Sequence, residues 1–265
     1  MLKLSGQEPS IHREGASTVQ TKPSTDSSRL GHLKYFYDIL GELEDRVGGK
    51  QILADCDGSM GWPQRGVYFF FEDGEKRVDS GKGLRVVRVG THALKHGAKS
   101  TFWGRLSQHR GNNHRSSIFR LLIGTALQGR DTTLDIDTWG VGSDAGSAAR
   151  KLDVDAAALR ERERALEQAV SAYIWQMPFL WVSVEDPSEP SSDRGYIERN
   201  SIALLSNYRQ LIVDKCWDIW LGKYCNRDRV TGSGLWNNNH VDESYRPEFL
   251  ERLSILASRT PPLRV

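Results

Sequence analysis

The chain has 265 residues, 26% of them charged, and its 36 Lys and Arg against 34 Asp and Glu leave a net charge of only +2. It is long enough to bury a substantial core, and no apolar run reaches the roughly 20 residues of a membrane span or forms a signal-peptide core, so we expect a cytoplasmic protein. The three cysteines form no CxxC pair and no zinc-binding spacing, which favours a reducing compartment over a disulfide scaffold.

For the first 63 residues we expect a flexible tail followed by one helix and its connection. Residues 1–29 are rich in Ser, Thr, Gln, Glu and Pro, a composition typical of a flexible tail. From Leu30 to Val47 the apolar residues recur every three or four positions until Gly48, which predicts an amphipathic helix. We therefore assign residues 30–63 to an N-terminal helix and its connection. The run Asp55–Gly58 begins like a calcium loop, but the later ligand positions do not follow, so we interpret it as a turn.

Two strands and a helix are predicted next. Val67–Phe71 and Leu84–Val89 are rich in β-branched and aromatic residues, and the Gly- and Asp-bearing segment between them is typical of a hairpin. After Gly90 the pattern changes to that of a helix, with Ser100 as the expected N-cap and Gly111 as the expected C-cap.

The charge is concentrated in one interval. Between Asp79 and Asp131 there is no acidic residue, so the ten Lys and Arg of this basic interval leave about −8 for the rest of a chain whose net charge is +2. The ten are Lys82, Arg85, Arg88, Lys95, Lys99, Arg105, Arg110, Arg115, Arg120 and Arg130, and four histidines, His92, His96, His109 and His114, lie among them. Such a stretch attracts polyanions, of which the phosphodiester backbone is the commonest.

The segment after Gly111 is expected to be mainly helical. A helix from about Ile118 is predicted, although its Ile and Phe content leaves a strand open. His114 and Arg115 precede it, where they either reach a bound phosphate or form a solvated basic loop. Residues 149–175 predict one long helix whose acidic residues offset its arginines.

Another strand and helix follow, and then an unusual C-terminal segment. Met177–Val184 is a strand by composition, and Ser191 or Ser192 can cap the next helix, which carries Glu198. Further on, Trp217 and Trp220 are expected in the core. The run Trp236–His240 offers amide side chains that are able to bond bases or phosphates, and a short helix is predicted after it.

Several of these residues, in this order, resemble the GIY-YIG nuclease superfamily. The resemblance rests on Gly66-Val67-Tyr68, on Arg88-Val89-Gly90, and on Arg105 with His109 on the next helix. It implies an α+β fold, a small antiparallel sheet flanked by helices, and a metal-dependent phosphodiesterase activity. It also implies a metal-binding glutamate on a later helix, which Glu198 fits, and a downstream asparagine near Asn207.

The sequence departs from that pattern in two ways. Arg88 stands where the second motif has a tyrosine, and the long separation between Arg105 and Glu198 implies a helical insertion at about residues 112–177. The resemblance thus suggests a nuclease-like domain over residues 64–207, followed by a Trp- and Asn-rich extension over residues 208–265.

The chemistry of phosphodiester hydrolysis assigns roles to these residues. Arg105 suits the scissile phosphate because its fixed fork of donors matches phosphate oxygens. Glu198 suits one Mg²⁺ or Mn²⁺ ion, with waters at the other coordination positions. Either Tyr68 or His109 is the base that activates water: a phenol needs nearby cations for this task, whereas an imidazole titrates near neutral pH. The expected substrate-binding residues are Arg88, Arg110, His114, Arg115 and Asn207.

The sequence therefore predicts a DNA endonuclease with a metal cofactor, and RNA stays open as an alternative substrate. A nucleic-acid-binding module without activity, suggested by the missing tyrosine, is the second hypothesis. The third is an interaction protein whose basic stretch docks an acidic partner.

Overall fold

A computed structural model describes residues 28–263, so the tail expected over residues 1–29 lies almost wholly outside the described residues. The sheet has the strand order β1-β4-β2-β3, and every neighbouring pair is antiparallel. The strands are β1 (Gln51–Ile52), β2 (Gly66–Lys76), β3 (Leu84–Gly90) and β4 (Pro178–Ser183). The predicted α+β class and small antiparallel sheet are confirmed.

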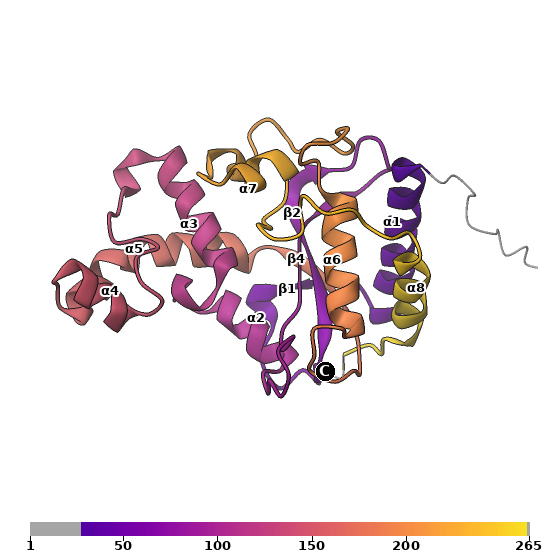
Figure 1. The fold of residues 1–265 in the computed structure, drawn as a ribbon, viewed down its shortest axis with the longest axis horizontal. Coiled ribbons are helices and arrows are strands. Elements are labelled where there is room, and N and C mark those ends of the chain that lie inside the picture. The colour runs from indigo at the N-terminus through magenta and orange to yellow at the C-terminus, as the bar shows by residue number, and fades with distance from the viewer. Residues whose placement is uncertain (1–27, 264–265) are drawn as a thin grey trace, which may run out of the picture.

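Helices surround this sheet (Figure 1). The α-helices are α1 (Arg29–Val47), α2 (Phe102–Arg110), α3 (Ile118–Arg130), α4 (Ala145–Leu152), α5 (Ala156–Trp175), α6 (Asp193–Leu205), α7 (Asp228–Ser233) and α8 (Phe249–Arg259). Short 3₁₀ turns are η1 (Leu53–Asp55), η2 (His114–Ser116), η3 (Thr132–Leu134) and η4 (Leu221–Tyr224). None of the helices within residues 28–263 combines the length and the apolar character that crossing a bilayer requires.

The two faces of the central hairpin pack on different helices. On one face Phe69 of β2 meets Phe36 of α1, with ring centroids 5.8 Å apart, and α1, α6 and α8 lie together at this side (Figure 1). On the other face Phe70 lies 5.4 Å from Phe119 of α3, and Tyr68 faces Phe102 of α2. The alternation of side chains along a strand therefore sends Tyr68 toward α2 and α3 and its neighbours toward α1.

The pairing of β2 with β3 contains a bulge. Phe70 pairs with Arg88 and Phe71 with Val86, so Val87 is an extra residue on β3. The outer edge of β3 is covered by the C-terminal extension, because the Val87 carbonyl accepts a 2.7 Å hydrogen bond from the Trp236 amide. This contact places the Asn-rich run of the extension beside the strand that carries the second motif.

Most expected element boundaries hold within a residue or two. Gly48 ends α1 in the left-handed conformation, Ser192 caps α6, and α3 is a helix rather than a strand. Two expectations were wrong. Thr101, not Ser100, accepts the capping hydrogen bond at the start of α2. The helix expected over residues 149–175 is divided at Asp153, which has a φ of 52° and ends α4 before α5 begins.

Candidate active site

A cavity of about 420 Å³ lies at the end of the β2–β3 hairpin. Side chains from five separate parts of the chain line it: β2, β3 with its following loop, α2 with the start of α3, α6, and the C-terminal extension. They are Tyr68, Arg88, Thr91, Leu94, Arg105, Ile118, Glu198, Ile202, Asn237, Asn238, Asn239 and His240. The structure thus brings Tyr68, Arg88, Arg105 and Glu198 together, as the motifs suggested.

His109 lies behind Tyr68, fully buried. Its Nε2 is 2.8 Å from the Tyr68 hydroxyl and its Nδ1 is 2.7 Å from the Ser117 hydroxyl. Burial, together with the charges of Arg105 and Arg88, holds the pKa of His109 well below its usual value, so the ring is neutral. Ser117 Oγ accepts from the Arg120 amide, and within residues 28–263 its own hydroxyl proton has no acceptor other than His109 Nδ1. We therefore assign the ring proton of His109 to Nε2, which donates to the Tyr68 oxygen.

Arg88, in place of the second-motif tyrosine, is a buried member of the site. It donates to the Trp236 carbonyl, and its guanidinium lies 4.7 Å from the centre of the Phe119 ring. Burial lowers its pKa, while the facing Tyr68 and Glu198 raise it. Arg88 Nε is buried without a hydrogen-bond partner in residues 28–263, so one donor of this cation is unused.

Arg105 occupies the helical position that the resemblance implies. It donates to Gln108 Oε1 at 2.7 Å and to the Ser116 carbonyl at 3.3 Å, yet within residues 28–263 no carboxylate pairs with it. Its Nε is also buried without a partner in that part of the chain. Arg88 and Arg105 therefore bring two positive charges without carboxylate partners in the described chain to one cavity, which is an arrangement suited to an anion.

Glu198 is the carboxylate of the cavity. Its Oε1 accepts a 3.1 Å hydrogen bond from the Thr91 amide, and Thr91 Oγ1 in turn donates to the Gly66 carbonyl of the first motif at 2.7 Å. Burial raises the pKa of Glu198, and the charges of Arg88 and His240 oppose that shift. No ion pair within 4 Å involves Glu198 in the described chain.

A divalent cation fits this carboxylate. The described residues contain no group of three or more His, Cys, Asp or Glu that could bind a metal by themselves. Mg²⁺ does not need such a group, because it keeps several waters and is commonly held by one or two carboxylates together with substrate phosphate. A cation beside Glu198 would also offset the cost of burying its charge.

The C-terminal extension contributes four residues that the motifs do not include. Asn237 is buried and exchanges two hydrogen bonds with the backbone of β3: Oδ1 accepts from the Val89 amide at 3.1 Å, and Nδ2 donates to the Val89 carbonyl at 2.8 Å. This pairing fixes the start of the run Asn238–His240, which lines the cavity. The Asn-rich composition was the available signal, but nothing in the sequence placed it beside β3.

Of the five expected substrate-binding residues only Arg88 lines the cavity, and Asn207 and Arg110 are two of the four that lie outside it. Asn207 uses its side chain to hold its own loop: Oδ1 accepts from Arg29 at 3.1 Å and from the Val213 amide at 3.0 Å, and Nδ2 donates to the Val213 carbonyl. Arg110 reaches the Ala54 carbonyl at 3.4 Å. Neither contact points to a substrate.

His114 and Arg115 have structural partners on α5. Arg115 forms two hydrogen bonds with the Glu163 carboxylate, at 2.6 and 2.7 Å, and the side chains of this pair are 4% exposed. His114 Nδ1 donates to Glu167 Oε1 at 2.8 Å, its Nε2 accepts from the Gly140 amide, and the ring stacks on Trp139. These two residues are neither a solvated basic loop nor exposed to a bound phosphate, because the α5 carboxylates hold them in the interior.

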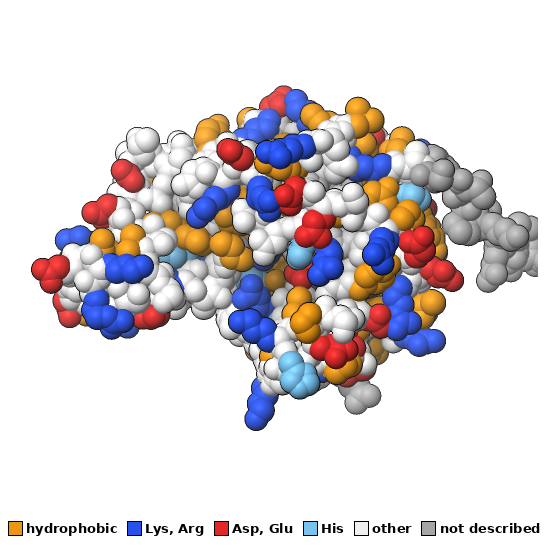
Figure 2. All heavy atoms as spheres, viewed as in Figure 1, with side chains coloured by type: hydrophobic (Ala, Val, Ile, Leu, Met, Phe, Trp, Pro, Cys, Tyr) orange, Lys and Arg blue, Asp and Glu red, His pale blue; other side chains and the backbone are white. Residues whose placement is uncertain are grey.

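The basic interval is therefore less basic at the surface than its composition indicates. Arg85 pairs with Glu75 and Arg120 with Glu167, both in the interior, and Arg88 is buried as well. Figure 2 shows Lys and Arg dispersed among Asp and Glu over the viewed face, and the lobe of α4 and α5 carries both signs. On the viewed face the basic residues form no continuous surface, so the feature that we expect to attract an anion is the pair of cavity cations, Arg88 and Arg105.

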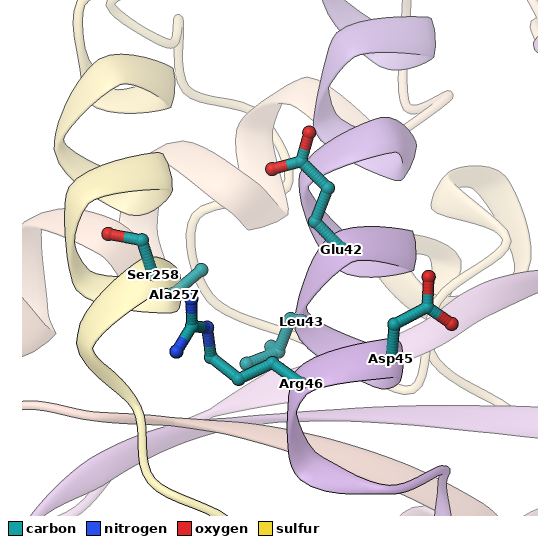
Figure 3. A pocket seen from close by; sticks show the side chains of 6 residues that line it. All are labelled: Glu42, Leu43, Asp45, Arg46, Ala257 and Ser258. Atoms are coloured by element: carbon teal, nitrogen blue, oxygen red, sulfur yellow. The ribbon is translucent and has the colours of Figure 1, made fainter. Parts of the chain in front are cut away.

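Two other hollows on the protein do not combine a motif tyrosine, arginines and a glutamate as the cavity at the β2–β3 hairpin does. Figure 3 shows one hollow of about 560 Å³ between α1 and α8, where Arg46 extends toward Ala257 and Ser258 while Asp45 points to the other side of α1. A larger one of about 750 Å³ lies between the loop before η2 and helices α4 and α5. Neither contains a residue of the two strand motifs.

The fold and the cavity define an α+β protein whose strand tyrosine, helical arginine and helical glutamate meet at the end of a β-hairpin. A family model described as GIY-YIG domain matches residues 27–262. The chain therefore belongs to the GIY-YIG domain family, which confirms the resemblance noted in the sequence. Comparison with curated proteins and with solved structures gives no match.

Proposed function

We propose that this protein is a metal-dependent endonuclease that hydrolyses phosphodiester bonds of DNA. The observation that carries the proposal is the meeting in one cavity of Arg88 and Arg105, which have no carboxylate partner in the described chain, with the carboxylate of Glu198, which forms no ion pair there. A phosphodiester and a divalent cation together satisfy all three groups. Membership of the GIY-YIG domain family also supports a nuclease-type activity.

The scissile phosphate is held by Arg105, whose partly exposed side chain has no carboxylate partner in the described chain. Arg88 lies deeper and adds charge that stabilises the additional negative charge of the transition state. When bound at Glu198, Mg²⁺ or Mn²⁺ would neutralise charge on the phosphate and on the leaving oxygen.

We assign Tyr68, in the phenolate form that has already released its own proton to solvent, as the group that takes the proton from the attacking water. His109 is less suited to end with that proton, because burial and three neighbouring arginines oppose a charged imidazole. Instead the His109 Nε2–H donates to the Tyr68 oxygen at 2.8 Å, and Arg88 places a positive charge facing Tyr68, so both groups stabilise negative charge on that oxygen. Of the two bases that the sequence left open, Tyr68 is thus the one proposed, and His109 is the group that positions it.

The test is cleavage of supercoiled plasmid by the purified protein with Mg²⁺ or Mn²⁺, in parallel with EDTA and with Arg105→Ala. We expect nicked or linear product only for the parent protein with metal. A parent protein that shifts DNA in a gel but never cuts it would replace the proposal by a binding module without activity. If it neither cuts nor shifts DNA, the hypothesis of an interaction protein would apply.

A further inference from the structure

His240 belongs to neither strand motif and is not the helical arginine or glutamate. It nevertheless lines the cavity, near enough for a charge on its ring to act on the Glu198 carboxylate. Its Nδ1 is 2.7 Å from Glu243 Oε1. A carboxylate accepts at that distance, so Nδ1 carries the proton and Nε2 keeps a lone pair. No hydrogen bond to His240 Nε2 occurs within residues 28–263.

Glu243 is itself fixed relative to the site. The guanidinium of Arg199, the residue that follows Glu198 on α6, lies 3.6 Å from Glu243 Oε2. The Glu243 amide also donates to the His240 carbonyl at 3.4 Å, which closes the turn between the two. The orientation of the His240 ring is thereby connected to the helix that carries Glu198.

The loop that carries His240 is anchored at several points. Arg229 donates to the Asn238 carbonyl at 3.1 Å, and the Ser206 hydroxyl at the end of α6 donates to the Val241 carbonyl at 2.6 Å. His240 itself has a φ of 65°, a left-handed conformation that is uncommon for non-glycine residues. These contacts hold the backbone of His240 in place at the cavity.

We propose that His240 is a second protein ligand, through Nε2, of the divalent cation held by Glu198, and that Glu243 orients it. The inference rests on the metal role of Glu198 in the proposed function. Histidine ligands commonly donate their other ring N–H to a carboxylate, which is the arrangement of His240 with Glu243. A ligand pair of one carboxylate and one imidazole favours Co²⁺ and Ni²⁺ over Mg²⁺ more strongly than a carboxylate alone.

The test measures Co²⁺ binding to the full chain without DNA, by calorimetry and by the visible absorption of the bound ion. We expect His240→Asn to weaken Co²⁺ binding at least about tenfold and to change the absorption spectrum, with a smaller effect on Mg²⁺ affinity. Asn is chosen because it tolerates a positive φ. Glu243→Gln should weaken Co²⁺ binding by roughly 10-fold or more through loss of orientation. The control is His96→Asn, since His96 is exposed and does not line the cavity.

Several outcomes would overturn the inference. If His240→Asn binds Co²⁺ with parent affinity and spectrum while Glu198→Gln does not bind it, His240 is no ligand and the proposed nuclease stands. A parent protein without any Co²⁺ or Mg²⁺ binding removes the metal role of Glu198 and this inference together. Thermal unfolding in EDTA identifies a variant that fails to fold, and in that case Glu243→Gln, which keeps the imidazole, decides the question by its Co²⁺ affinity.

Discussion

The Tyr68 hydroxyl lies where a side chain at Gly90 would begin. The two residues are partners across β2 and β3, and a Cβ on Gly90 would stand 2.3 Å from the Tyr68 hydroxyl oxygen. The glycine of the second motif therefore makes room for the tyrosine of the first. This relationship explains why two weak motifs on neighbouring strands occur as a pair.

Gly90→Ala should move the Tyr68 ring and lower the rate of DNA cleavage by about a hundredfold, because small misplacements of a catalytic group are costly. Overpacking should also cost about 1–3 kcal/mol of unfolding free energy. Plasmid cleavage and urea denaturation measure the two effects. Gly41→Ala is the matched control: nothing lies within 4 Å of its Cβ, so it should gain about 0.5–1 kcal/mol and cut normally. Normal cleavage by Gly90→Ala would show that Tyr68 has no catalytic role.

Glu198→Gln should lower the cleavage rate at least about a hundredfold, since it keeps the side-chain volume but removes the charge that a hard cation requires. DNA binding should survive because Arg88 and Arg105 are unchanged. Single-turnover cleavage and gel-shift titration separate the two properties. Cleavage at the parent rate by a folded Glu198→Gln protein would exclude the metal role of this residue.

Arg115→Ala should destabilise the protein by about 3–5 kcal/mol, because it leaves the Glu163 charge buried without its partner. The salt dependence of DNA affinity should not change, since Arg115 is not available to phosphate. Urea denaturation and binding titrations at several salt concentrations check both statements. The exposed Lys99, changed to Ala, serves as the control for a basic residue without such a partner. A stable Arg115→Ala protein with a reduced salt slope would restore the phosphate-binding role that the sequence suggested.

The free energy of unfolding should fall as the pH drops below about 6.5. Burial and the nearby charge of Arg194 lower the pKa of His92 to about 4, so the unfolded chain binds a proton that the folded protein does not. Stability from this residue is complete above pH 6.5 and is lost as the pH falls toward 4, at about 1.4 kcal/mol per pH unit. Denaturation at pH 7.5 and 4.5 should therefore show a smaller loss for His92→Gln than for the parent protein. For His96→Gln the loss should match the parent, because His96 is exposed.

Local signals were sufficient for most of the fold. The Ser192 cap and the Gly48 terminator act within a few residues of the chain, so their effect is readable from sequence. The break between α4 and α5 was missed because the charged repeat after it continues a helical pattern, although Asp155 caps α5 through its own side chain. The available signal was that aspartate, at a position where a helix begins.

Long-range partners account for what the sequence could not show. Arg115 and Glu163 are 48 positions apart, and no local pattern distinguishes such a buried pair from two solvated charges. Trp217 and Trp220 are three positions apart and were both expected in the core. Trp220 is buried there, and its Nε1 donates to Glu72 at 3.1 Å, but the expectation was wrong for Trp217, which is exposed. The contribution of His240 to the cavity likewise depends on the pairing of Trp236 with Val87.

That pairing at the edge of β3 has a consequence for the synthesis of the protein. The Trp236 amide closes onto a strand made about 150 residues earlier, and the wall of the cavity includes Asn237 and His240. A nascent chain that already carries Tyr68, Arg105 and Glu198 still lacks this wall until the ribosome has translated and released the region around residue 240. A translation product that stops before Trp236 would leave the β3 edge open to pairing with other chains. Because the same segment covers this edge and completes the cavity, we expect activity and protection against aggregation to arise together, late in translation.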